Sequence, residues 1–244
     1  MVVKQLAFEF VAPASPTLDV FVDGRNAEVV QHLRELAATR TGERAIYLWG
    51  AASSGRTHLL HGTLAALERG GARVAYVAGA STPAAEALAE ADAVAIDDIE
   101  RLSEADQGVV FNLYNRLRDS GGVLLAAGNA PPAQLRLRPD VVTRLAWGLV
   151  YEVHALSDPE KAQALAEHAA TRGFSLPPEV SRHLLTHVRR DMRSLIAILE
   201  SLDRYSLETK RPVTLTLVRE MLQSERGERG EGRGEKTEPQ ETRK

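Results

Sequence analysis

The chain has 244 residues, of which 44% are hydrophobic, enough for one domain of ordinary size and a smaller second one. It contains no cysteine, which excludes a disulfide framework and any thiolate metal site or nucleophile. With 30 basic and 33 acidic residues the formal charge is -3, so no overall positive field would draw the chain to nucleic acid. We find neither the apolar run of a signal peptide nor the ~20 apolar residues of a membrane span, and expect a cytoplasmic protein.

Residues 1–22 combine a short apolar stretch with a linker of prolines and small residues, and we expect a flexible arm that adds nothing to a core. The next segment, 23–155, alternates helical and strand patterns. The predicted helices cover 26–39, 57–69, 83–90, 104–119 and 139–144, and the predicted strands cover 45–49, 72–78, 93–97, 123–128 and 149–153. This alternation predicts an α/β domain, a parallel sheet flanked by helices on both faces, with its ligand site at the carboxyl ends of the strands.

After residue 155 the pattern becomes wholly helical, over 157–170, 178–188 and 192–207, without a convincing strand. We therefore predict a small helical domain at 156–223. From 224 to 244 the chain has no large apolar residue, and six Glu stand against four Arg and two Lys. Such a segment cannot bury enough surface to fold, so we expect a disordered polar tail.

Residues 50–57, GAASSGRT, nearly match the phosphate-binding loop G-x-x-x-x-G-K-[ST] and join a predicted strand to a predicted helix. The backbone amides and the helix dipole at such a junction bind anions, and Gly50 and Gly55 would let the backbone approach a phosphate closely. Thr57 would bind Mg²⁺, while Arg56 keeps the charge of the usual lysine but not its point contact. A plain Gly/Ser turn is the alternative. The predicted nucleotide-binding residues are Gly50, Ser54, Gly55, Arg56, Thr57 and His58.

Polar residues follow two later predicted strands, 93–97 and 123–128. Asp97 and Asp98 close the run AVAIDDIE, where Asp97 would hold the water shell of Mg²⁺ and Asp98 would orient an attacking water as a base. Asn129 ends the run LAAGN, where it could bond the γ-phosphate or that water. The alternatives are an acid pair that caps the next segment and an ordinary turn asparagine.

These segments together resemble the AAA+ ATPases, in the branch of the bacterial replication initiator DnaA. YLWGAASSGRTHLLHG resembles the Walker A segment, VAIDDIE the Walker B segment and LAAGN the sensor 1 strand. The chain is more similar still to the Hda-like regulatory inactivators of DnaA, through FNLYNRLRDSGG, LRPDVVTRLAWGLVYEVHALSDPEK and RGFSLPPEV. In that family an arginine at the Walker lysine position is familiar, and the resemblance covers residue 5 to about residue 223.

The resemblance implies an AAA+ fold with a small helical lid and a bound adenine nucleotide, ADP or ATP with Mg²⁺, of which ADP is expected. Arg144 matches the arginine finger that enters the nucleotide site of a neighbouring subunit; an ion pair with Asp140, one turn earlier, is the alternative from the residues alone. Arg193 matches sensor 2, reaching from the lid to the nucleotide, against a solvated arginine. Similar initiators carry another arginine in place of Asp140, which implies reduced self-assembly and leaves a homo-oligomer open.

Residues 5–10, QLAFEF, resemble the peptide with which replication proteins dock on the sliding clamp. Leu6, Phe8 and Phe10 would be apolar anchors and Gln5 a polar registration point, although an edge strand folded onto the sheet would show the same alternation. DnaA carries a helix-turn-helix domain after its lid, where this chain has only the polar tail. We therefore expect contact with DNA to be indirect, through the clamp.

The sequence thus predicts a negative regulator of replication initiation that docks on the clamp, binds adenine nucleotide and inserts Arg144 into the ATP site of DnaA to stimulate hydrolysis there. Its intrinsic ATPase activity is expected to be weak. One alternative is an autonomous AAA+ ATPase that loads or remodels replication proteins. Another is a scaffold that bridges DnaA and the clamp without triggering hydrolysis.

Overall fold

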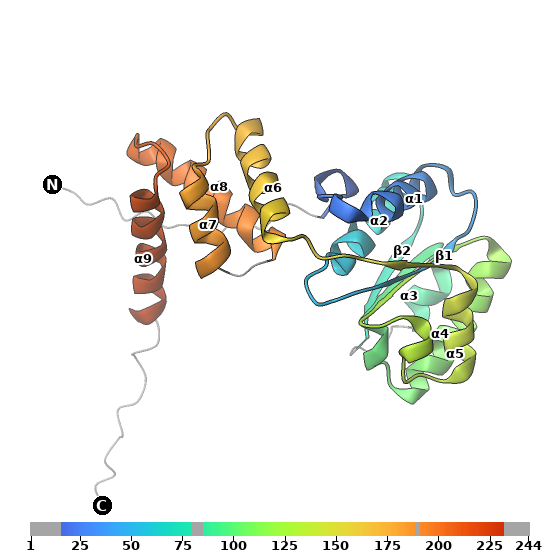
Figure 1. The fold of residues 1–244 in the computed structure, drawn as a ribbon. Helices are drawn as coiled ribbons and strands as arrows, with labels where there is room; N and C mark the ends of the chain where they lie inside the picture. Colours follow the sequence, from blue (N-terminus) through green and yellow to red (C-terminus); the bar gives the residue numbers. More distant parts are fainter. Residues whose placement is uncertain (1–15, 80–84, 189–190, 232–244) are drawn as a thin grey trace, which may run out of the picture. The chain divides into compact units, whose positions relative to one another are not determined.

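The computed structural model describes residues 16–79, 85–188 and 191–231. They belong to two compact units (Figure 1), an α/β unit that ends at Ser157 and a helical unit that begins at Asp158. The boundary predicted from the change of pattern lies at residue 155. None of the described helices is both long and apolar enough to cross a membrane.

The α/β unit is built on one five-stranded parallel sheet, as predicted. The strands are β1 (Ala45–Trp49), β2 (Val74–Ala78), β3 (Ala93–Asp97), β4 (Val123–Gly128) and β5 (Leu149–Glu152), and they lie in the order β2-β3-β4-β1-β5. The carboxyl ends of β1, β4 and β3 are consequently neighbours. The phosphate-loop candidate, the sensor 1 candidate and the acid pair follow these ends.

Helices cover both faces of the sheet, with α1 and α2 on one face and α4 and α5 on the other (Figure 1). Successive strand residues point to opposite faces, so Ile46 and Leu48 pack with α1 and α2, while Tyr47 packs with the other helices. The helices are α1 (Ala27–Thr39), α2 (Arg56–Arg69), α3 (Ala85–Glu90), α4 (Glu104–Ser120) and α5 (Pro139–Trp147), with short 3-10 turns η1 (Leu18–Val20), η2 (Gly24–Asn26), η3 (Ile99–Arg101) and η4 (Pro132–Gln134).

The expected boundary of the flexible arm at residue 22 is wrong for the part that the structure describes. Leu18 is only 3% exposed and lies in the core beneath α1 and α2, and Phe21 packs against the same core. A Cβ added to Gly62 of α2 would lie 3.0 Å from the backbone nitrogen of Leu18, so the segment passes directly over this helix. The apolar residues of this segment outweigh its linker-like prolines, and the α/β unit begins before residue 23.

Two polar contacts fix the ends of helices in this unit. Ser103 caps α4, because its Oγ accepts a hydrogen bond from the Asp106 amide (3.2 Å) and donates one to the Asp106 carboxylate (2.6 Å). The buried side chain of Asn26 makes both of its bonds to one residue: it donates to the His154 carbonyl (2.9 Å) and accepts from the His154 amide (2.8 Å). The start of α1 is thereby tied to the chain that leaves β5.

The helical unit consists of α6 (Asp158–Thr171), α7 (Pro178–His187), α8 (Met192–Thr209) and α9 (Leu215–Glu231) in its described part. Its core includes Leu165, Leu184, Leu199 and Leu217. The predicted disordered tail is wrong for residues 224–231, where α9 continues without a break. A helix already nucleated by buried apolar residues extends at small cost through glutamate and arginine, which are good helix formers. Residues 232–244 lie outside the described residues.

Candidate functional site

The loop of residues 50–57 joins β1 to α2, and its two glycines cannot carry a side chain. A Cβ on Gly50 would collide with the Val153 carbonyl oxygen. Gly55, the residue before α2, has a φ of 106°, and its Cβ would lie 2.7 Å from the ring of Phe21. The loop therefore packs closely against the Val153 carbonyl at one end and the Phe21 ring at the other, and glycine is required at both points.

Two features of this loop fit the phosphates of a nucleotide. The amides of the first turn of α2 have no acceptor within the helix, and the helix dipole adds positive potential there. Ser54 is 6% exposed, and within the described part of the chain its Oγ has no hydrogen-bond partner. Because a buried hydroxyl without a partner is costly, a phosphate oxygen at this point would satisfy it.

The structure brings the predicted metal residues together. Thr57 donates its hydroxyl hydrogen to Asp97 Oδ2 at 2.6 Å, across forty residues of sequence. Asp97 is 4% exposed, and its Oδ1 accepts the Asp98 amide at 2.9 Å. A threonine hydroxyl and a carboxylate held in this way are ligand types that Mg²⁺ accepts beside phosphate oxygens. When bound, the ion would neutralise phosphate charge, and Thr57 and Asp97 would hold it.

Tyr76 of β2 is a further partner of this carboxylate that the sequence did not indicate. Its hydroxyl donates to Asp97 Oδ2 at 2.9 Å, and its ring stacks on His61 with the centroids 4.1 Å apart. Burial, then the charge of Asp97, raises the pKa of the phenol, so it remains a neutral donor at physiological pH. The only signal in the sequence is its place near the end of a strand beside the Walker B strand.

Arg56, the residue that departs from the phosphate-loop pattern, turns toward the protein itself. Its guanidinium donates to the carbonyl oxygen of Gly128, at the end of β4. The neighbouring Tyr47 donates to the Ala130 carbonyl at 2.7 Å, and its pKa is raised by burial and the charge of Glu100, against the lowering effect of Arg56. Arg56 therefore links the phosphate loop to the sensor 1 strand.

The two other polar candidates lie at the same edge of the sheet. Asp98 has a left-handed backbone, with a φ of 47°, and its carboxylate forms an ion pair with Arg101 at 3.6 Å. Asn129 is exposed and follows Gly128 directly. Their roles as a base and as a γ-phosphate contact stay predictions.

His58 faces the N-terminal segment. Its Nε2 lies 2.8 Å from the Thr17 carbonyl oxygen, and its ring centroid lies 5.4 Å from that of Phe21. These contacts hold Phe21 over Gly55, so His58 supports the loop through this aromatic ring. Phe21 is not predicted from the sequence, because the prolines before it indicate a linker. The apolar run VFV, residues 20–22, is the one sequence feature that points to it.

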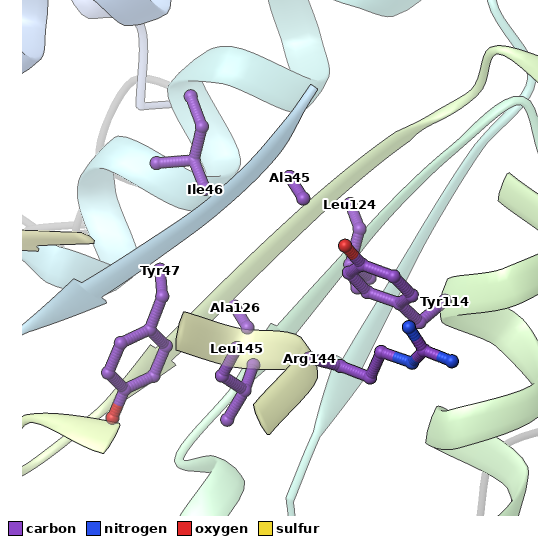
Figure 2. Close-up of a pocket in the computed structure, with 8 residues that line it drawn as sticks. All are labelled: Ala45, Ile46, Tyr47, Tyr114, Leu124, Ala126, Arg144 and Leu145. Carbon is purple, nitrogen blue, oxygen red and sulfur yellow. The ribbon is translucent and has the colours of Figure 1, made fainter. Parts of the chain in front are cut away.

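Arg144 lies on α5 against three aromatic rings, of which Figure 2 shows that of Tyr114. Its Cζ is 4.1 Å from the ring centroid of Trp147, 5.2 Å from that of Phe111 and 5.5 Å from that of Tyr114. The residue is half-buried, and its Nη1 has no hydrogen-bond partner in the part of the chain that the structure describes. Spacing of three residues on a helix predicts the contact with Trp147, but the two rings from α4 require the fold.

The alternative interpretation of Arg144, an ion pair with Asp140, is wrong. Asp140 instead binds Arg138, with 2.7 Å between the charged atoms, and this hydrogen bond lowers the pKa of the carboxyl group. Arg138 precedes α5, and the pair closes around the first turn of the helix. Arg144 therefore has no carboxylate partner among the described residues.

Two predicted features are not brought to the loop by these observations. Arg193 lies at the second position of α8, in the helical unit, where it is exposed. Its contact with nucleotide stays a prediction. The clamp-binding candidates Gln5, Leu6, Phe8 and Phe10 lie outside the described residues.

Solved structures with this architecture include DnaA and RuvB proteins. Domain III of DnaA from Thermotoga maritima is 21% identical, with 85% of this chain and 95% of that chain covered and a TM-score of 0.68. AMPPCP-bound DnaA from Aquifex aeolicus is 20% identical, covers 76% of this chain and 64% of that chain, and has a TM-score of 0.65. A RuvB variant from Thermotoga maritima is 14% identical, with 88% and 73% covered and a TM-score of 0.61. At these identities the likeness shows the fold.

Sheet order, flanking helices and a C-terminal helical unit give the chain the AAA+ type of fold that the DnaA and RuvB structures share. Residues 158–222 match the family model described as the Hda lid domain. The helical unit thus matches an Hda-type lid, and the chain as a whole has the fold of the DnaA structures.

Gly55→Ala should weaken the binding of a fluorescent ADP analogue at least about tenfold, because a Cβ there adds left-handed strain and displaces either Phe21 or the loop. The matched control is Gly71→Ala. Gly71 also has a positive φ, of 82°, but no atom lies within 4 Å of its added Cβ. Both variants should lose similar stability in urea, and equal ADP affinity in the two would contradict a phosphate-binding role for the loop.

Proposed function

We propose that this chain is a negative regulator of replication initiation that binds an adenine nucleotide with Mg²⁺, docks on the sliding clamp and supplies Arg144 to the ATP site of DnaA. The observation that carries the proposal is the different use of two arginines. Arg56, beside the chain's own phosphate loop, is bonded to Gly128, while Arg144 is half-exposed and has no carboxylate partner among the described residues.

The nucleotide is proposed to be ADP, acting as a structural ligand. A side chain bonded to a backbone carbonyl is not organised around the charge that develops on a γ-phosphate during hydrolysis. Loop amides, Ser54 and the Thr57–Asp97 pair are enough to hold a diphosphate and its metal ion. Weak intrinsic turnover follows, although the Walker B acids and Asn129 are present.

Arg144 would act by bringing a guanidinium to the γ-phosphate bound to DnaA. This group neutralises charge in the transition state and is worth about 10³ to 10⁵ in rate in comparable systems. The lid family and the DnaA-like fold support DnaA as the partner. A homo-oligomer remains an alternative use of the same surface.

Arg144→Ala should remove the stimulation of DnaA hydrolysis almost completely, measured as phosphate release from DnaA-ATP in the presence of DNA-loaded clamp and this chain. Arg136→Ala is the matched control, because Arg136 is an exposed arginine just before α5. It should leave stimulation unchanged. Full stimulation by the Arg144 variant would remove the basis for the finger and favour a scaffold that only bridges DnaA and the clamp.

Deletion of residues 5–10 should abolish co-elution with the clamp in gel filtration and the clamp-dependent part of the stimulation. Leu6, Phe8 and Phe10 are proposed as the anchors and Gln5 as the registration point. A variant with the charge change Lys4→Glu keeps all four side chains and serves as the control. Persistent co-elution of the deletion variant would place the clamp contact elsewhere.

The rival function is an autonomous AAA+ ATPase that loads or remodels replication proteins. The Thr57–Asp97 hydrogen bond and the nearby Asp98 and Asn129 favour it, since these are the groups of a hydrolytic site. Under the proposal the isolated chain hydrolyses ATP slowly, and Asp98→Asn changes its stimulation of DnaA little. Brisk phosphate release that Asp98→Asn abolishes would establish the rival instead.

A further inference from the structure

Arg144 is held in an aromatic cradle, by which we mean the rings of Phe111 and Tyr114 on α4 and Trp147 on α5. Two pairs with a spacing of three residues face each other, Phe111 with Tyr114 and Arg144 with Trp147. Figure 2 shows the guanidinium of Arg144 next to the ring of Tyr114, and both residues line a small cavity. The guanidinium therefore lies against its own molecule.

The cradle satisfies the charge of Arg144 without satisfying its hydrogen-bond donors. The faces of aromatic rings attract a cation, and tryptophan attracts it most strongly. Nη1 is buried without an acceptor in the described part of the chain, which opposes this attraction. When the side chain leaves the cradle, Nη1 regains a hydrogen bond while the ring contacts are lost. The two effects oppose each other, so the folded-back position is only weakly favoured.

Trp147 is the member of the cradle that best fits a releasable contact. Its ring is the nearest to Arg144, at 4.1 Å, and 56% of the residue is exposed. Tyr114, by contrast, is 6% exposed and part of the core on this face of the sheet. Trp147 can therefore move or be replaced without disturbing the packing beneath it.

We infer that Trp147 is a positioning residue for Arg144: it holds the guanidinium folded back in the free chain and gives it up to a phosphate on the partner. This inference rests on the proposed role of Arg144 as a finger. A side chain that is half-buried against its own helices must extend to reach a nucleotide on another molecule. The stacking on Trp147 therefore competes with the contact to the phosphate. A stronger stack raises the concentration of this chain that is needed for half-maximal stimulation.

The stacking has a spectroscopic test that is independent of DnaA. The chain has two tryptophans, Trp49 and Trp147, so the full chain labelled with 5-fluorotryptophan should give two ¹⁹F resonances, assigned with Trp147→Phe. Arg144→Gln should shift the Trp147 resonance and leave that of Trp49 in place. The control Arg136→Gln should move neither. An unmoved Trp147 resonance in the Arg144 variant overturns the inference.

The consequence is tested in the DnaA hydrolysis assay. Trp147→Leu, which removes the ring face, should lower the concentration of this chain that gives half-maximal stimulation about threefold. Trp147→Phe retains an aromatic face and should stay close to the unchanged chain. An unchanged or higher requirement for Trp147→Leu overturns the inference, since the ring would then be neutral or would support the extended finger. If Arg144→Ala retains stimulation, the proposed function fails, while the ¹⁹F shift still reports the stacking.

Discussion

The hydrogen bond from Thr57 to Asp97 joins the two halves of the site. It connects the first turn of α2 to the end of β3, two segments separated by forty residues, and it exists because the parallel sheet places the carboxyl ends of its central strands along one edge. The side chain of Asp97 can be buried because its carboxylate oxygens accept three hydrogen bonds, from Thr57, Tyr76 and the Asp98 amide. The position of the loop, of the metal residues and of the sensor 1 strand all depend on this edge.

The sequence predicts the centre of the sheet well because both faces of β3 and β4 are buried. Strands such as AVAID and VLLAAG are therefore continuous apolar runs, bounded by turns, and their limits agree with β3 and β4. The predictions fail where the local pattern and the packing disagree. Phe21 and Leu18 follow prolines and yet pack on the core, and α9 continues to Glu231, beyond the last large apolar residue of the sequence.

The sequence is enough to propose the candidate residues of the site, but it does not indicate several of their contacts. The loop pattern identifies Thr57 and the strand pattern identifies Asp97, and their spacing suggests that they meet. No pattern in one dimension indicates that Tyr76 shares the same carboxylate oxygen, that Phe21 covers Gly55, or that Asp140 binds Arg138. These contacts depend on which neighbours the fold brings to each side chain, and the choice between two partners for one charge is decided in three dimensions.

The environments of the two arginines also separate what each can do. The Gly128 carbonyl oxygen accepts a hydrogen bond from Arg56, which links the loop of residues 50–57 to β4. Aromatic rings hold Arg144 through its charge and leave Nη1 without an acceptor. The guanidinium of Arg56 is bonded to the backbone, whereas that of Arg144 retains a donor without an acceptor among the described residues. Under the proposed function, a chain with arginine in place of the usual loop lysine can still bring the positive charge that another nucleotide site needs, provided that the contact holding this charge is weak enough to release it.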